Sequence, residues 1–168
     1  DRGASVALFG LRGGRLVLLA ESDPIGRPHR WLNPVGVADV DGDGSAEVAA
    51  VVTPHLAGLL TFYRRRGNHL AAVHRSAGFS NHAAGSRELN MAAMADFDGD
   101  GVVDIALPGL ARETLRVVTL AGGSLTSLAE VPLGREISTA IIAADLDGNG
   151  RADLALGLAD GQLVVLTR

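Results

Sequence analysis

Short apolar stretches of four to eight residues alternate along the chain with turns rich in glycine and aspartate. This pattern is typical of β-strands joined by tight turns. Gly67-Asn68, Gly122-Gly123 and Asp160-Gly161 lie between consecutive stretches and favour two-residue hairpins. The expected strands are 5–10, 15–21, 34–38, 47–53, 59–63, 69–75, 91–95, 103–107, 114–120, 124–131, 140–144, 153–158 and 162–167. The sequence therefore predicts an all-β chain.

One segment argues locally for a helix. Residues 88–95 read ELNMAAMA, and alanine, leucine and methionine are good helix formers. The equivalent segment nearer the N-terminus contains Pro34, Val35, Gly36 and Val37, which is poor helix sequence. Because the two segments occupy the same place relative to a shared motif, a strand is predicted for both.

The shared motif is an acidic loop that occurs three times. Its copies are DVDGDGSAE (39–47), DFDGDGVVD (96–104) and DLDGNGRAD (145–153). An apolar strand precedes each copy, and two or three strands follow it. Four antiparallel strands per repeat of about fifty residues make a propeller blade. The predicted fold class is therefore a β-propeller with four-stranded antiparallel blades, of which the chain supplies a partial ring.

The strand count divides the chain, residues 1–168, into one partial propeller domain with four parts. Residues 1–28 are expected to be strands of an incomplete blade, 29–80 and 81–132 two full blades, and 133–168 an incomplete last blade. Partial blades leave open sheet edges, which attract other strands. The expected partner is therefore the remainder of the propeller, supplied by another chain or by a symmetry copy.

The acidic loops are candidate calcium sites. Carboxylates at alternate positions converge when the loop curls, and the glycines permit that curl. Calcium takes six to eight hard oxygen ligands, which side chains at positions one, three, five and nine and the carbonyl at position seven could supply. We expect up to three Ca²⁺ ions, bound by Asp39, Asp41, Asp43, Ser45 and Glu47; by Asp96, Asp98, Asp100, Val102 and Asp104; and by Asp145, Asp147, Asn149, Arg151 and Asp153. Asn149 removes one charge, so the third loop is expected to bind most weakly.

The motif D-x-D-G-D/N-G-x-x-D/E followed by an apolar strand resembles the FG-GAP or VCBS repeat family. Such repeats build calcium-bearing propellers in integrin α-subunit heads and in secreted bacterial proteins. The resemblance implies that Asp39, Asp41, Asp43, Glu47 and their counterparts are metal ligands. It also implies an extracytoplasmic location, where calcium is plentiful.

A second similarity precedes each inner strand and predicts a ligand platform on the face opposite the acidic loops. Arginine, asparagine and acidic side chains would ring the channel mouth there, with Trp31 available for stacking. The alternative is that these arginines only bridge neighbouring blades. The residues are Arg30, Trp31, Asn33, Arg87, Glu88, Asn90, Arg135 and Glu136.

Composition narrows the function classes. The net charge is −4, and Arg64-Arg65-Arg66 is interpreted as a solvated hairpin tip, so no nucleic-acid surface is expected. No apolar run reaches the length of a membrane span. The leading hypothesis is a non-enzymatic extracellular module that recognises a carbohydrate or a protein. The alternatives are a fragment of a propeller-fold polysaccharide lyase or hydrolase, and a purely structural scaffold.

Overall fold

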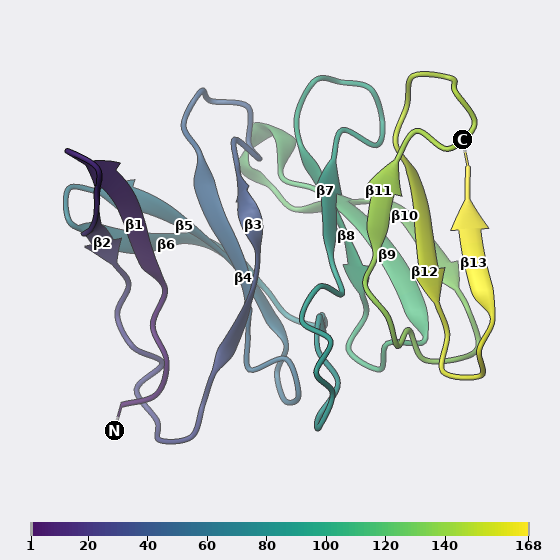
Figure 1. The fold of residues 1–168 in the computed structure, drawn as a ribbon, viewed down its shortest axis with the longest axis horizontal. Helices are drawn as coiled ribbons and strands as arrows, with labels where there is room; N and C mark the ends of the chain where they lie inside the picture. The colour runs from purple at the N-terminus through teal and green to yellow at the C-terminus, as the bar shows by residue number, and fades with distance from the viewer. Residues whose placement is uncertain (1, 168) are drawn as a thin grey trace.

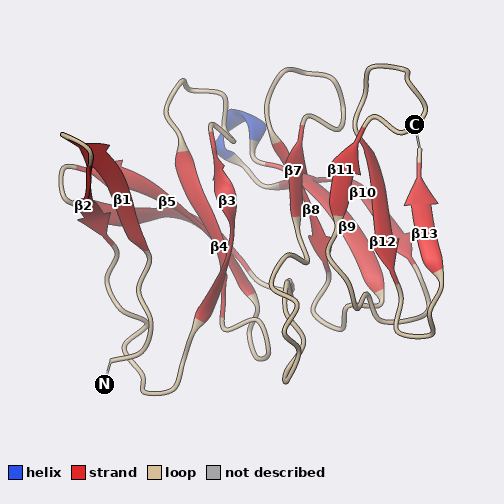
Figure 2. Cartoon of the chain, in the orientation of Figure 1, coloured by secondary structure: helices blue, strands red, loops and turns tan. Residues whose placement is uncertain are grey.

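The computed structural model describes residues 2–167, and thirteen β-strands form almost all of their regular structure (Figures 1 and 2). No α-helix occurs among them, and residues 88–95 end in a strand as predicted. The strands are β1 (Ala7–Arg12), β2 (Arg15–Glu21), β3 (Leu32–Ala38), β4 (Glu47–Val52), β5 (Leu59–Arg66), β6 (His69–Ser76), β7 (Ala93–Ala95), β8 (Asp104–Pro108), β9 (Thr114–Thr119), β10 (Thr126–Pro132), β11 (Ile142–Ala144), β12 (Asp153–Gly157) and β13 (Leu163–Leu166). One 3₁₀ turn, Ala121–Gly123, lies between β9 and β10.

The strands form three antiparallel meanders that stand side by side as blades (Figure 1). Blade 1 is β3-β4-β5-β6, blade 2 is β7-β8-β9-β10, and blade 3 is β11-β12-β13. The first strands of successive blades are neighbours, because β7 contacts both β3 and β11. The chain is therefore a partial β-propeller, as the repeats predicted.

The hydrophobic cores lie between the blades, because the second strands of blades 1 and 2, β4 and β8, bury both of their faces. In β8, Ile105 and Leu107 pack toward blade 1, whereas Ala106 packs toward blade 3. In β4, Ala49 and Val51 pack toward blade 2. Alternate residues of a strand point to opposite faces, so one apolar run serves two seams.

The first hairpin, β1-β2, is attached differently from the expected separate blade. It joins the sheet of blade 1 through one parallel bridge, Glu21 to His69 of β6. Its inner face also packs on blade 1, where Val6 and Ala20 share a core with residues of β4 to β6. The division of the chain at residues 28, 80 and 132 stays a prediction.

The outer face of blade 3 exposes apolar side chains that its neighbour buries. The strand register places Ile142, Leu146, Leu163 and Val165 at the positions that Ala93, Phe97, Leu115 and Val117 occupy in blade 2. The blade 2 residues are at most 9% exposed in the core between blades 2 and 3, whereas their blade 3 counterparts are 48–74% exposed. Blade 3 thus presents half of an interblade seam.

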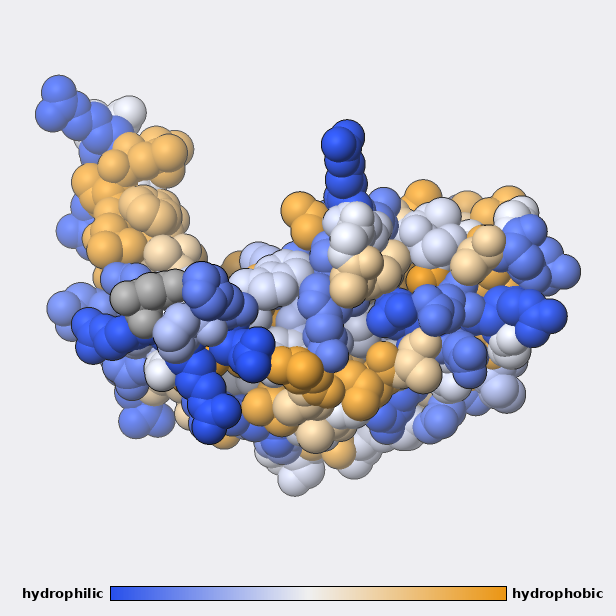
Figure 3. Space-filling model, turned by 90° about the horizontal axis from the view of Figure 1, so that it is seen from below, coloured by the Kyte–Doolittle hydropathy of each residue, from blue (hydrophilic) through white to orange (hydrophobic). Residues whose placement is uncertain are grey.

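The opposite end of the molecule carries a second exposed apolar face. Four side chains of the β1-β2 hairpin, in two cross-strand pairs, are more than half exposed: Phe9, Leu11, Leu16 and Leu18. They belong to the arm that projects at the left of the space-filling view (Figure 3). Both ends of the stack of blades are therefore apolar.

Candidate metal centres

The three acidic loops share one backbone conformation, organised by the first aspartate of each motif. In the first loop, Asp39 accepts hydrogen bonds from the amides of Gly42 and Gly44 at 2.9 and 2.8 Å. Asp96 and Asp145 accept the corresponding pairs in the other loops. All six glycines have φ between +76° and +87°, a region that side chains disfavour, so the two glycines of each motif are required by its curl.

The third and fifth positions continue the same pattern. The aspartate at position three accepts a hydrogen bond from the amide of position five, as Asp98 does from Asp100 at 3.1 Å. The side chain at position five accepts a hydrogen bond from the amide of position seven, as Asp100 does from Val102 at 2.8 Å. Asn149 takes this role with its amide oxygen and so preserves the loop's shape without the charge.

The ninth carboxylate reaches the loop from the start of the second strand, and it is buried. Asp104 is fully buried, and its Oδ2 atom accepts the amide of Phe97 at 2.9 Å. Glu47 and Asp153 make the same bond to the second residue of their loops. The Oδ1 atom of Asp104 is buried and makes no hydrogen bond of good geometry with the described residues, although the Thr119 hydroxyl is near enough to lower the pKa of this carboxyl. Such a group is costly unless a cation or a proton satisfies it.

The electrostatics of the second loop separate its two ends. Burial raises the pKa of Asp104, the hydrogen bonds from the Phe97 amide and the Thr119 hydroxyl lower it, and the nearby carboxylates of Asp98 and Asp100 raise it again, with a net shift upward. The amides of Gly101 and Gly99 instead lower the pKa of Asp96. The ionised form is therefore favoured at Asp96 and disfavoured at Asp104, and a positive charge near Asp104 would favour its ionised form.

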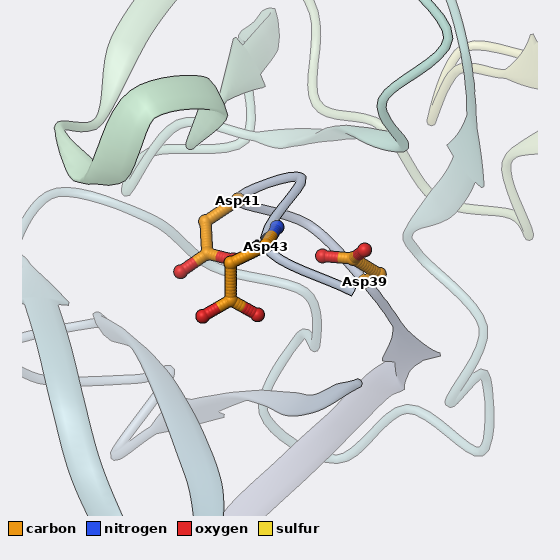
Figure 4. A group of neighbouring side chains, drawn as sticks. All are labelled: Asp39, Asp41 and Asp43. Atoms are coloured by element: carbon orange, nitrogen blue, oxygen red, sulfur yellow. Dashed lines mark hydrogen bonds between the residues drawn. The ribbon is translucent and has the colours of Figure 1, made fainter. Parts of the chain in front are cut away.

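Carboxylate oxygens converge in every loop. The groups Asp39, Asp41 and Asp43; Asp96, Asp98 and Asp104; and Asp145, Asp147 and Asp153 each place ligand atoms within 4.8 Å of one another. Figure 4 shows the first group, with Asp41 and Asp43 close together and Asp39 across the turn. Clusters of hard oxygens at this spacing suit Ca²⁺. The carbonyl ligands expected at Ser45, Val102 and Arg151 stay a prediction.

The first loop differs from the other two, because an arginine enters it. The Arg64 guanidinium in β5 contacts Asp41, Asp43 and Glu47 at 2.6 to 2.7 Å. The interpretation of Arg64 as part of a solvated hairpin tip was wrong for this residue, since only 26% of its side chain is exposed. Arg64 reaches the acidic loop because it is paired with Glu47 across β4 and β5, and this pairing is visible only in the structure.

On the opposite face, Trp31 lies in a histidine cluster that sequence reasoning missed. Its ring centroid is 5.4 Å from that of His55 and 4.7 Å from that of His82. With Arg30, Thr53 and other residues it lines a pocket of about 180 Å³. His55 Nε2 and His82 Nδ1 are 2.7 Å apart. His82 Nε2 lies 3.2 Å from the backbone carbonyl oxygen of Ser86, which can only accept a hydrogen bond. His82 Nε2 is therefore the protonated nitrogen of the neutral ring, and His82 Nδ1 accepts a hydrogen bond from His55 Nε2.

Asn33 and Asn81 fasten blade 1 to the segment that follows it. The Asn33 side chain is buried and donates to the carbonyls of Asn81 and Leu89, and Asn81 donates back to Asn33 and Pro34. The described contacts therefore place Asn33 in the interior of the structure rather than on an accessible platform.

The remaining platform candidates do not converge on Trp31 in the described contacts. Glu136 pairs with Arg112 at 2.7 Å, which links the β8-β9 turn to blade 3. Arg135 lies 3.7 Å from Asp160, and Glu88 accepts the amide of Asn90. Arg30, Arg87 and Asn90 are exposed. Arginine does bridge blades here, but through Arg112, which the sequence comparison did not select.

The histidine pair gives a pH prediction. Burial lowers the pKa of His55, and His82 and the Arg112 guanidinium lower it further. A lowered pKa favours folding with the imidazole neutral, so this stability is present above the unfolded pKa and is lost as pH falls through the folded pKa. We expect the melting temperature to fall between about pH 7 and pH 5, and less so in His55→Gln, measured by differential scanning fluorimetry. His69→Gln, at an exposed position, should keep the wild-type profile.

Comparison with known proteins connects this geometry to a family. Residues 96–156 match the model described as FG-GAP-like repeat, a span that contains the second and third acidic loops. The search of curated proteins found no match to the chain. The resemblance inferred from the acidic motif is therefore confirmed over residues 96–156, which match the FG-GAP-like repeat.

Proposed function

We propose that the chain is a calcium-stabilised β-propeller module that works in extracytoplasmic recognition. The observation that carries the calcium proposal is the buried carboxylate of Asp104, which lies beside Asp96 and Asp98 and whose hydrogen-bond donors, the Phe97 amide and the Thr119 hydroxyl, are both neutral. Without a counter-charge, this cluster would destabilise the blade by repulsion and desolvation. No helix of the described residues has the length and apolarity to cross a membrane.

In the second loop, Asp96, Asp98 and Asp104 would hold the ion, and Asp145, Asp147 and Asp153 would do so in the third. Bound calcium would supply positive charge and join the loop to the second strand. Backbone amides of the loop orient these ligands. The amides of Gly99 and Gly101 donate to Asp96, and the amide of Phe97 donates to Asp104. Millimolar calcium outside the cytoplasm matches the affinity of many extracellular calcium modules.

Recognition is proposed on the opposite face, at the pocket of Trp31 and Arg30. Two residues that line it, His29 and Thr53, have φ values of 55° and 49°. Positive φ is strained for a β-branched residue, and such strain clusters at binding sites. An indole for stacking beside a guanidinium for polar contacts suits a carbohydrate.

The exposed face of blade 3 is proposed to pack against a further four-stranded blade of the same propeller. Its four apolar residues occupy the positions that close the seam between blades 2 and 3. A blade of this family offers the complementary pair, as Leu154 and Leu156 of blade 3 do toward blade 2. The partner is thus the remainder of the ring, on a longer chain or on another copy.

Replacing Asp104 tests the calcium proposal. Asp104→Asn should lower the number of bound calcium ions by one in isothermal titration calorimetry, because it removes the buried ligand charge. Saturating calcium should stabilise the wild type by about 2.7 kcal/mol at a hundredfold excess over Kd for each site, and the variant should lose one such increment. Asp23→Asn, at an exposed position outside the loops, is the matched control. Unchanged melting in EDTA and in calcium would contradict the proposal.

A glycan array tests the recognition face. We expect carbohydrate binding that Trp31→Ala lowers at least tenfold, while the melting temperature stays within a few degrees because Trp31 is only half-buried. Arg87→Ala should bind like the wild type, since Arg87 lies outside the pocket. If no glycan binds the calcium-loaded protein, the carbohydrate assignment fails.

Light scattering tests the proposed seam. On size-exclusion chromatography the 168-residue chain should elute as an assembly, and Leu163→Arg should shift it toward the monomer because a charge cannot be buried in the seam. Leu89→Arg changes an equally apolar exposed residue outside this face and should leave the mass unchanged. A calcium-loaded wild-type monomer would contradict closure of the ring by another copy of this chain.

A further inference from the structure

We propose that Arg64 is a resident cation of the first acidic loop, so that this loop is closed by the protein itself and only the second and third loops bind calcium. The inference rests on the proposed calcium function of the motif. It revises the expected number of ions from three to two, and it makes the first loop rather than the third the weakest site.

The contacts of Arg64 are those that a bound cation would make. Its Nε atom donates to Glu47 Oε1 at 2.7 Å, Nη1 to Asp43 Oδ2 at 2.7 Å, and Nη2 to Asp41 Oδ2 at 2.6 Å. The planar guanidinium has five donors, so one side chain can bridge three carboxylates. Three of the four acids of the first loop are thereby paired.

The need for this charge comes from Glu47. Its side chain is fully buried, and its Oε1 atom accepts a hydrogen bond from Arg64 Nε at 2.7 Å. A guanidinium stays protonated in proteins, so Arg64 is a permanent positive charge beside this carboxylate. A buried carboxylate with a permanent hydrogen-bonded partner no longer requires a metal ion.

The other two blades lack this cation at the same place. Arg64 is paired with Glu47 across β4 and β5. The same register position is Thr119 opposite Asp104 in blade 2, and Thr167 opposite Asp153 in blade 3. Threonine carries no charge. In these two loops the ninth carboxylate belongs to the oxygen cluster, whereas in the first loop Glu47 is turned to Arg64 and only Asp39, Asp41 and Asp43 form the cluster.

Calcium could enter the first loop only by displacing Arg64 from its partners. The guanidinium is held at high local concentration by its own strand, whereas the ion must be drawn from solution. Arginine and calcium thus compete for the same oxygens, and the arginine does not dissociate. The first loop should keep its conformation in a chelator that loosens the other two.

Arg64→Thr tests this by placing in blade 1 the residue that blades 2 and 3 carry. We expect wild-type protein to bind two calcium ions per chain in isothermal titration calorimetry, and Arg64→Thr to bind three. In EDTA the variant should melt at least several degrees below the wild type, and saturating calcium should recover most of that loss. Arg66→Thr removes the same charge from the same strand two residues away and should still bind two ions.

The outcomes separate the inference from the calcium function on which it rests. Wild-type protein that binds no calcium overturns the calcium proposal. Three ions in the wild type, or two in a folded Arg64→Thr, overturn the role of Arg64 while leaving calcium binding intact. If Arg64→Thr fails to fold, hydrogen exchange of the wild type decides. Protection of residues 39–47 should be unchanged by calcium while that of 96–104 and 145–153 rises, and a matching rise in all three refutes the inference.

Discussion

The structure depends on the hydrogen bond between the ninth carboxylate of each acidic loop and the amide of the second loop residue. That bond ties the loop to the strand that follows it. It also fixes the second residue, which in the first two loops is part of the core: Val40 lies in the seam between blades 1 and 2, and Phe97 in the seam between blades 2 and 3. Its counterpart Leu146 lies on the exposed face of blade 3. The acidic turn and the hydrophobic seam are therefore one structural unit, and whatever satisfies the carboxylate also supports the packing.

This coupling explains why a carboxylate is kept at a position that is otherwise ideal for an apolar residue. The second strands β4 and β8 are buried on both faces, and the carboxylate at the start of each second strand is at most 2% exposed, so it has lost most of its water. Two chemically different groups can offset the desolvation of this carboxylate. Arg64 pairs with Glu47 in blade 1, whereas the carboxylates facing Asp104 leave a demand that a divalent cation can meet.

The strands and the acidic loops could be predicted from the sequence because their signals are local. Continuous apolar runs define β4 and β8, and two glycines with left-handed backbone define each loop. The role of Arg64 could not be predicted, because it depends on the β4-β5 register across a hairpin. The bridge between β2 and β6 was missed for the same reason, since it joins strands separated by most of a blade. Asn33 was taken for a platform residue because sequence shows a side chain's type but not its burial.

The two apolar ends of the molecule are not alike. One is a two-stranded hairpin arm, and the other is the broad face of a three-stranded sheet (Figure 1). Contact between two different surfaces is heterologous, so an assembly built by joining one end to the other has a direction. The rotation from each blade to the next then decides whether successive units form a closed ring or an open filament.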